Sequence, residues 1–298
     1  MRFRNPVGAW RSARAELTAM RSQLADVSAQ VQALQQFNSG AHAATMQALR
    51  YVRDDDAAAR AQLWALRATP EYEAAFTEDE PLVTVIITTY RNFKELRERS
   101  LPSVLAQTYE RFEVLVVGDA AAPEAEQVCR SFNDDRVRFV NLPYRGPYPD
   151  QPERAWYVSG TAPYNTGLAL AKGSWIGSNS DDDALRPEYI ETLLALARDQ
   201  QAEVPYGQID EHHPDDDNVL LCTFPPSNGH WGTQCSMFHG ALRFLPHQPT
   251  DWIFETPNDW GLCERMLRIG VRFAMTDTPV CDYYPSSLWS DRIGRDYF

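Results

Sequence analysis

Three runs of three consecutive aspartates occur in this chain, at 54–56, 181–183 and 215–217. Neighbouring carboxylates repel one another, so each run needs a compensating partner. Clustered carboxylate oxygens are also the ligands that Mg²⁺ and Mn²⁺ prefer in proteins. The elements around each run therefore decide whether it is a helix start, a solvated turn or a metal site.

Two of the runs have an ordinary structural explanation. The run at 54–56 precedes the helix-forming stretch AAARAQLWALRA, and acids in the first turn of a helix compensate its free amides and its dipole. The run at 215–217 follows Pro214 and precedes NVLLCTF, which we predict to be a strand. Aspartates after a proline are turn formers, so a turn is favoured there.

The run at 181–183 lies in a different setting. From Pro81 onward, apolar strands (LVTVIITTY, FEVLVVGDA, RVRFVNL, SWIGSNS) alternate with helical stretches, which predicts an α/β fold with a parallel sheet. The run directly follows the last of these strands and precedes the predicted helix RPEYIETLLALARD. Ligands of open α/β sheets bind beyond the carboxyl ends of the strands, so this run is the predicted metal site.

The first 68 residues are predicted to form a helical, partly coiled-coil extension. Apolar residues recur there at spacings of three and four, at Leu17, Met20, Leu24, Val27, Val31 and Leu34. The pattern predicts self-association, packing of the helix on its own domain, or contact with a membrane surface through the arginines near Trp10. Residues 69–80 are acidic and predicted to be a linker, and residues 81–298 form the main domain.

Composition narrows the classes of partner. The net charge of −13 argues against a nucleic-acid partner, because a polyanion needs a basic face. Five widely spaced cysteines without a CxxC predict reduced thiols rather than a disulfide framework or a zinc site. No apolar stretch reaches the roughly 18 residues of a membrane span. We therefore expect a cytoplasmic protein, with peripheral contact at the inner face of the membrane through residues 1–40 as an alternative.

Four segments occur in the order found in a known family: VTVIITTYRN, SLPSVLAQTYERFEVLVVGD, YNTGLALAKGSWIGSNSDDDALRPEYI and NDWGLCERMLRIGVRF. Residues 81 to about 285 resemble family 2 glycosyltransferases of the GT-A fold, and in particular the inverting type of spore-coat polysaccharide biosynthesis. The resemblance implies a doubly wound mixed sheet. It also implies a sugar nucleotide as donor and a divalent metal, Mn²⁺ or Mg²⁺, as cofactor.

The resemblance implies four nucleotide-sugar contacts in the first half of the main domain. Thr88 and Tyr90 contact the base and the ribose, and Asp119 accepts the N3–H of a pyrimidine. Arg154 lies near the phosphates, whose geometry suits a guanidinium. Gly118 stands where the family often has an acid.

The aspartate run matches the metal motif of the family. The resemblance implies that Asp182 binds the metal and that Asp181 contacts the ribose or a water on the metal. Ser180 replaces the first acid of the commoner Asp-x-Asp pattern. Asp183 is expected to cap the helix that starts near Pro187.

Asp259 matches the catalytic base of the family, with Asn258 at a position where an acid is common. An inverting enzyme needs such a base to take the proton of the acceptor hydroxyl, here on a glycan or a lipid-linked acceptor. Its local alternative is a helix N-cap. His239 and the tryptophans 231, 252 and 260 are further candidates near the acceptor.

Two alternatives to this function remain. A sugar-phosphate nucleotidyltransferase shares the fold class, but the loop TTYRNFKEL lacks the glycines which that chemistry uses. A non-catalytic nucleotide-binding scaffold, oligomerised by its N-terminal helix, is the other. The presence of both Asp182 and Asp259 favours the transferase.

Overall fold

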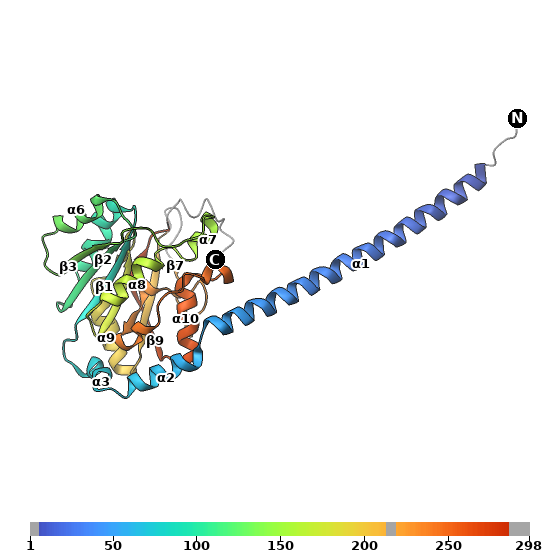
Figure 1. Cartoon of the computed structure of the whole chain (residues 1–298). Coiled ribbons are helices and arrows are strands. Elements are labelled where there is room, and N and C mark those ends of the chain that lie inside the picture. The colour runs from blue at the N-terminus through green and yellow to red at the C-terminus, as the bar shows by residue number, and fades with distance from the viewer. Residues whose placement is uncertain (1–5, 213–218, 286–298) are drawn as a thin grey trace. The chain divides into compact units, whose positions relative to one another are not determined.

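The computed structural model describes residues 6–212 and 219–285 (Figure 1). The third aspartate run, 215–217, lies outside the described residues. The chain divides into two compact units, Met1–Asp55 and Asp56–Phe298. Within the described ranges, no helix has the length and apolar character needed to span a membrane.

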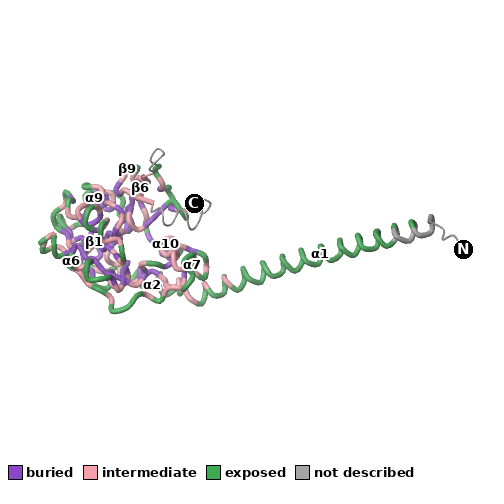
Figure 2. Tube along the Cα trace, turned by 90° about the horizontal axis from the view of Figure 1, so that it is seen from above, coloured by how far each residue is buried: buried purple, intermediate pink, exposed green. Residues whose placement is uncertain are grey.

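The first unit consists of one helix, α1 (Pro6–Arg53), which confirms the predicted helical extension. The six residues of the apolar pattern are all exposed, and Leu24 is 72% exposed. Figure 2 shows α1 as exposed along nearly all of its described length. The predicted self-association is not tested by a single chain and stays a prediction.

The boundaries of the domains differ from those expected. Helix α2 (Asp56–Arg67) belongs to the second unit, and α3 (Pro70–Thr77) forms within the predicted linker. The Tyr72 backbone N–H donates to the Thr69 hydroxyl at 3.3 Å, so Thr69 caps α3 ahead of a proline in its first turn. Tyr72 and Phe76 are buried, and this burial holds the acidic segment on the domain.

A buried carboxylate fastens α2 and α3 to the main domain. Glu203, which is fully buried, accepts two hydrogen bonds from the Arg67 guanidinium and one from the Tyr72 hydroxyl, each at 2.7 Å. Burial alone would raise the pKa of Glu203, but these bonds and the N–H of Arg272 hold it below its ordinary value. The network explains why residues 56–77 are part of the domain.

The central sheet has the order β3-β2-β1-β4-β8. The first four strands are parallel and β8 runs antiparallel to β4, which confirms a mixed α/β sheet. Their bounds are β1 (Val83–Thr89), β2 (Phe112–Gly118), β3 (Val137–Asn141), β4 (Trp175–Ser180) and β8 (Met237–His239).

The second sheet has the order β5-β9-β6-β7. An isolated bridge between Tyr206 on β6 and Ser236, the residue before β8, links it to the first sheet. β6 and β9 are parallel, whereas β5 and β7 are antiparallel to their neighbours. The bounds are β5 (Ala184–Leu185), β6 (Val204–Glu211), β7 (Val219–Leu220) and β9 (Phe273–Tyr283).

Helices connect and cover these strands; α8 packs on β1 and β2, and α9 packs on β6 and β9. The α-helices are α4 (Phe93–Glu95), α5 (Leu101–Leu105), α6 (Pro123–Ser131), α7 (Pro152–Trp156), α8 (Thr161–Leu170), α9 (Tyr189–Gln200) and α10 (Asn258–Ile269). A π-helical turn (Leu96–Ser100) joins α4 to α5, and 3-10 turns occupy Thr233–Cys235, Gly240–Phe244 and Asp251–Phe254.

Gly173 lies where the chain passes close to β1. Helix α8 ends at Leu170, before this glycine. A Cβ on Gly173 would lie 2.5 Å from the backbone nitrogen of Thr84. The glycine is therefore required by the close approach of the chain to β1 rather than by helix termination.

Candidate active site

Three of the predicted site segments follow adjacent parallel strands. In the sheet register, Thr88 pairs with Ser180, and Thr89 pairs with Gly118. The residues after β1, β2 and β4 consequently meet at one edge, the carboxyl edge of the sheet. This edge brings together Tyr90, Asp119 and the run at 181–183.

Asn92 holds the first two aspartates of the run. Its side-chain amide donates to Asp181 Oδ1 at 2.9 Å and to Asp182 Oδ2 at 3.3 Å. The backbone N–H of Tyr90 donates to Asp181 Oδ2 at 3.3 Å, and Arg99 donates to the backbone carbonyl of Asp182 at 2.6 Å. Sequence reasoning missed Asn92 and Arg99, because only the folded loop brings them to the run.

The run is electrostatically strained. Burial, together with the charge of Asp181, raises the pKa of Asp182 to about 6, and burial raises the pKa of Asp181 and Asp183. Within residues 6–212 and 219–285, no arginine, lysine or histidine side chain forms an ion pair with these carboxylates. Adjacent, desolvated oxygen ligands of this kind fit a hard divalent cation, which would relieve their repulsion.

The sequence led us to expect that Asp183 caps the following helix, and this prediction is wrong. Its Oδ1 accepts the backbone N–H of Tyr284 at 3.0 Å, and α9 starts at Tyr189 without a side-chain cap. The Arg99 guanidinium lies 3.8 Å from the centre of the Tyr284 ring. Asp183 and Arg99 thus fix the chain that leaves β9 beside the aspartate run.

Asp119 and Tyr90 share an arginine that sequence reasoning did not select. Asp119 is buried and accepts the backbone N–H of Gly146 at 3.0 Å. The Nε of Arg145 lies 3.8 Å from Asp119 Oδ2, and its guanidinium lies 4.0 Å from the centre of the Tyr90 ring. Arg145 therefore supplies positive charge at the predicted nucleotide contacts.

The predicted phosphate contact, Arg154, lies elsewhere. It is exposed on α7, with its guanidinium 5.4 Å from the centre of the Trp252 ring. It does not line the cavity described below. Between β3 and α8 the chain forms only the short helix α7, so the sequence pattern could not fix which arginine of this segment faces the carboxyl edge.

Gly118, which replaces a common acid, is required by its surroundings. A Cβ at this position would lie 2.4 Å from Asn141 Oδ1. That oxygen accepts the N–H of Ala121 at 2.9 Å, and the Asn141 amide donates to the carbonyl of Ala121 at 2.8 Å. The turn after β2 includes Ala120 with φ of 51°, so the Asn141 clamp holds a strained turn that leaves no room for a side chain at Gly118.

A cavity of about 280 Å³ lies at this edge of the sheet. It brings Thr88 at the end of β1 and Ser180 at the end of β4 together with Asp259 at the start of α10. The other lining residues are Trp156, Ser159, Gly160, Tyr164, Ser178, Asn179, Thr233, Gln234, His247, Pro257, Asn258 and Tyr283. The size and the polar lining suit part of a sugar.

Tyr283 connects this cavity to the aspartate run. Burial raises the pKa of its hydroxyl, and the negative charges of Asp183, Asp182 and Asp259 raise it further. The side chain at the end of β9 thus lies within electrostatic reach of both the predicted metal ligand and the predicted base.

Asp259 occupies the first turn of α10 and has the properties of a base. Its Oδ1 accepts the backbone N–H of Trp260 at 2.7 Å, while the N-cap position is Pro257. Burial raises the pKa of Asp259 to about 6, and the Trp260 N–H bond opposes that rise. A carboxylate with this pKa is ionised at pH 7 and remains basic enough to accept a proton.

Asn258 is better suited to its position than an acid. Its amide donates to the Thr161 hydroxyl at 2.9 Å and to the carbonyl of Ser159 at 3.2 Å. An ionised carboxylate accepts but cannot donate, so it could not form these bonds. Asn258 thereby fastens the start of α10, and with it Asp259, to the start of α8.

Two of the acceptor-side candidates, His239 and Trp231, are buried. His239 is buried, with Nε2 at 3.1 Å from the carbonyl of Tyr72, and Nδ1 accepts the N–H of Ala241. Trp231 is buried near Phe238. Trp156, which the sequence reasoning did not select, is the tryptophan that lines the cavity.

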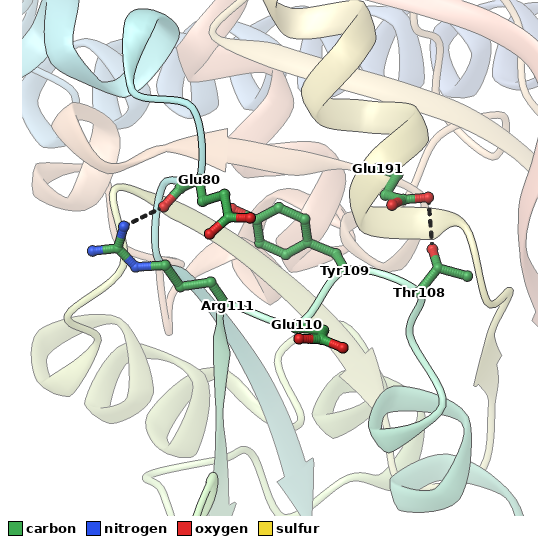
Figure 3. A pocket seen from close by; sticks show the side chains of 6 residues that line it. All are labelled: Glu80, Thr108, Tyr109, Glu110, Arg111 and Glu191. Atoms are coloured by element: carbon green, nitrogen blue, oxygen red, sulfur yellow. Dashed lines mark hydrogen bonds between the residues drawn. The ribbon is translucent and has the colours of Figure 1, made fainter.

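Two other features do not form part of this site. A hollow of about 540 Å³ lies near the residues that precede β1 and β2, and so at the opposite edge of the sheet; its lining is Glu80, Thr108, Tyr109, Glu110, Arg111 and Glu191 (Figure 3). Asp210, His212 and Asp282 lie close together on the second sheet. The Arg186 guanidinium lies 2.7 Å from both carboxylates and pairs with them. All five cysteines are free, as predicted, and they are buried.

Comparisons with known proteins find glycosyltransferases. Residues 84–149 match the sequence model of glycosyl transferase family 2. The chain is 27% identical over 142 residues to glycosyltransferase GlyG of Streptococcus pneumoniae serotype 4, covering 47% of this chain and 43% of that protein. It is 30% identical over 131 residues to the succinoglycan biosynthesis protein ExoO of Rhizobium meliloti, covering 44% of this chain and 34% of ExoO. The chain thus spans less than half the length of these relatives.

Solved structures share the fold. TarS of S. aureus in complex with UDP-GlcNAc superimposes with a TM-score of 0.55 at 15% identity, over 68% of this chain and 58% of that one. The mannosyltransferase PcManGT from Pyrobaculum calidifontis in complex with GDP-Man and Mn²⁺ gives a TM-score of 0.50 at 15% identity, over 75% and 68%. The family match within residues 84–149, the relatives and the shared fold together support a family 2 glycosyltransferase of the GT-A fold.

Proposed function

We propose that the chain is an inverting, metal-dependent glycosyltransferase that moves a sugar from a nucleotide-sugar to a hydroxyl of a glycan or lipid-linked acceptor. The observation that carries the proposal is the cavity shared by Thr88, Ser180 and Asp259 beside the aspartate run. A donor seated over the carboxyl edge would place its diphosphate at the run and its sugar in the cavity.

The nucleoside part of the donor would bind at Tyr90 and Asp119. The Tyr90 ring offers an aromatic face, and the buried Asp119 carboxylate offers an acceptor for the N3–H of a pyrimidine. Arg145 contacts both residues and so lies at the nucleoside end of the proposed site, whereas Arg154 lies against Trp252. The Arg145 guanidinium lies over the Tyr90 ring, the same ring that the nucleoside would use.

Asp182, with Asp181 beside it, would hold the cation. Mn²⁺ or Mg²⁺ bound there would offset the negative charge that develops on the departing nucleoside diphosphate. The chain's own contribution is to keep the carboxylates in place through Asn92 and to keep Asp181 buried.

Asp259 would act as the general base. It would accept the proton of the acceptor hydroxyl as that oxygen attacks the anomeric carbon from the face opposite the diphosphate, which inverts the configuration. The sugar carries positive charge in such a transition state, as in an oxocarbenium ion. A nearby carboxylate stabilises this positive charge. The hydrogen bonds of Asn258 hold the base rigidly at the wall of the cavity.

Surface polysaccharide synthesis is the proposed setting. Among the relatives are proteins named for succinoglycan biosynthesis and for colanic acid biosynthesis, the latter WcaA of Escherichia coli. An acceptor of this kind, assembled on a lipid carrier, fits an enzyme that works in the cytoplasm or at the inner face of a membrane.

The proposal is tested by release of nucleoside diphosphate from a panel that includes UDP-GlcNAc and GDP-Man, with Mn²⁺ and a total glycolipid extract as acceptor source. Turnover of one donor by the natural chain, and its loss in Asp259→Asn with donor binding retained, would support the transferase. Donor binding without turnover under all conditions would instead favour the nucleotide-binding scaffold.

A further inference from the structure

Helix α1 carries an exposed apolar face made of Leu17, Met20, Leu24, Val27, Val31 and Leu34. Each of these side chains is at least 46% exposed. A row of aliphatic side chains in water is unfavourable, and about 25 cal/mol is gained for each Å² of apolar surface that a partner removes from water. We therefore expect a partner to cover this face of α1.

The spacing identifies that occupant as another α-helix. The six residues fall on alternate a and d positions of a heptad, with Leu17, Leu24 and Val31 at a. The spacing of 3.5 residues keeps such a seam facing one partner helix along its length. A helix that lies on a membrane surface has a wider apolar face than this seam. Here polar residues border the seam on both sides, so the apolar face is narrow.

Charge and polarity then select a second copy of α1 in the parallel direction. Continuing the heptad places Asn38 at a, and a single asparagine at a favours two parallel strands in register, because the two amides bond to each other. Glu16 falls at g and Arg21 at the next e position. In a parallel pair these two residues of opposite charge face one another across the seam, twice per dimer.

We infer that α1 forms a parallel, two-stranded coiled coil with α1 of a second copy of this chain, with its register set by Asn38 and by Glu16–Arg21 pairs between the helices. The inference concerns the first unit alone and holds whether or not the chain transfers a sugar. In the parallel arrangement, the C-termini of both copies of α1 lie at the same end of the coiled coil. The two main domains therefore continue the chains from that end.

The mass of the full chain in solution tests the pairing. Sedimentation equilibrium of the full chain at micromolar concentration should give twice the chain mass of 33.9 kDa. Val27→Asp, at d, should give the single-chain mass, and Ala29→Asp, on the outer face two residues away, should leave the dimer intact. A single-chain mass for the natural protein, or a trimer or tetramer, would overturn the inference.

Direction and register are tested by oxidative cross-linking, since the five natural cysteines are buried in the second unit. Thr45→Cys, at a, should give a covalent dimer within the parallel, in-register pair, whereas Ala43→Cys, on the outer face, should not. Cross-linking of both variants to the same extent, or of neither, would contradict the proposed arrangement.

The charge pair gives an independent readout. Arg21→Glu should raise the dissociation constant of the dimer roughly 5-fold, because each pair changes from attraction to repulsion. Adding Glu16→Arg should restore the natural dissociation constant. Failure of the second change to restore it would show that these residues do not face each other. Binding to anionic lipid vesicles by a chain that stays single in solution would favour the membrane-surface helix and overturn the coiled coil.

Discussion

Asp259, at the start of α10, and Thr88, at the end of β1, line one cavity at the carboxyl edge of the sheet. The first residue is the proposed base and the second is a proposed donor contact. Their shared cavity gives the acceptor hydroxyl a place between them, and this arrangement underlies the predictions that follow.

Asp259→Asn should lower kcat at least 100-fold, because the amide keeps the shape and the Trp260 N–H bond but cannot accept the hydroxyl proton. The rate of sugar transfer measures this, with donor affinity measured separately by calorimetry. Asp199→Asn, an exposed aspartate at the end of α9, is the matched control and should transfer at the natural rate. Equal rates for both variants would exclude Asp259 as the base.

The pH profile should show the ionisation of the same group. Burial raises the pKa of Asp259 to about 6, and the base works only when it is ionised. We expect kcat/KM to fall about tenfold for each pH unit below about 6, at constant metal and donor concentrations. A rate independent of pH from 7 down to 5 would contradict this assignment.

Asp259→Asn should also stabilise the fold at high pH. The folded pKa of about 6 lies above the ordinary value of 3.8, so ionisation opposes folding. This cost is absent below pH 3.8, grows through the interval and is complete above pH 6. Thermal unfolding should show a gain of several degrees for the variant at pH 8 that shrinks toward pH 4. A gain that does not change with pH would point to packing instead.

Asp182→Asn should abolish the metal dependence of donor binding. The amide removes one negative ligand from the run, and metal affinity depends on the charge of the ligands. Titration of a nucleoside diphosphate in Mn²⁺ and in EDTA measures the effect; the natural chain should bind at least tenfold more tightly with Mn²⁺. Asp135→Asn, an exposed control, should keep that difference. Unchanged metal dependence in Asp182→Asn would place the metal elsewhere.

Gly118→Asp should destabilise the domain by about 1–3 kcal/mol, because the new side chain overlaps Asn141. Denaturant unfolding measures the change. Removing the opposing side chain with Asn141→Gly in the same chain should recover part of the loss relative to Gly118→Asp alone. No loss in Gly118→Asp would mean that the Asn141 clamp yields easily and does not explain the glycine.

Much of the sheet was predictable because the central strands β1 and β2 consist mostly of apolar residues. The strands 83–89, 112–118 and 175–180 are almost wholly buried, and buried parallel strands are continuous apolar runs. The α3 helix was missed in the segment 69–80 because acidic residues outnumber its two large apolar residues. The signals were present in Thr69 and Pro70, which are typical of a helix start.

The site was predictable where its residues directly follow a strand, as Asp119 and Asp182 do. Arg145, Asn92 and Tyr283 reach the same edge from loops and from a different sheet, and no local pattern fixes where such residues point. Arg154 was selected by its position in the chain, yet the structure turns it toward Trp252. Tertiary placement of irregular segments thus limits what the sequence reveals.

A thermal-shift panel of UDP, dTDP, GDP and CDP, each with Mn²⁺ and with EDTA, tests the central claim most directly, because it needs no acceptor. A ligand that binds only the folded state raises the melting temperature by mass action. We predict that one nucleotide raises it with Mn²⁺ but not with EDTA, and that Asp182→Asn loses this increase. No shift with any of the four nucleotides in the presence of Mn²⁺ would contradict a metal-dependent nucleotide-sugar site at this edge of the sheet.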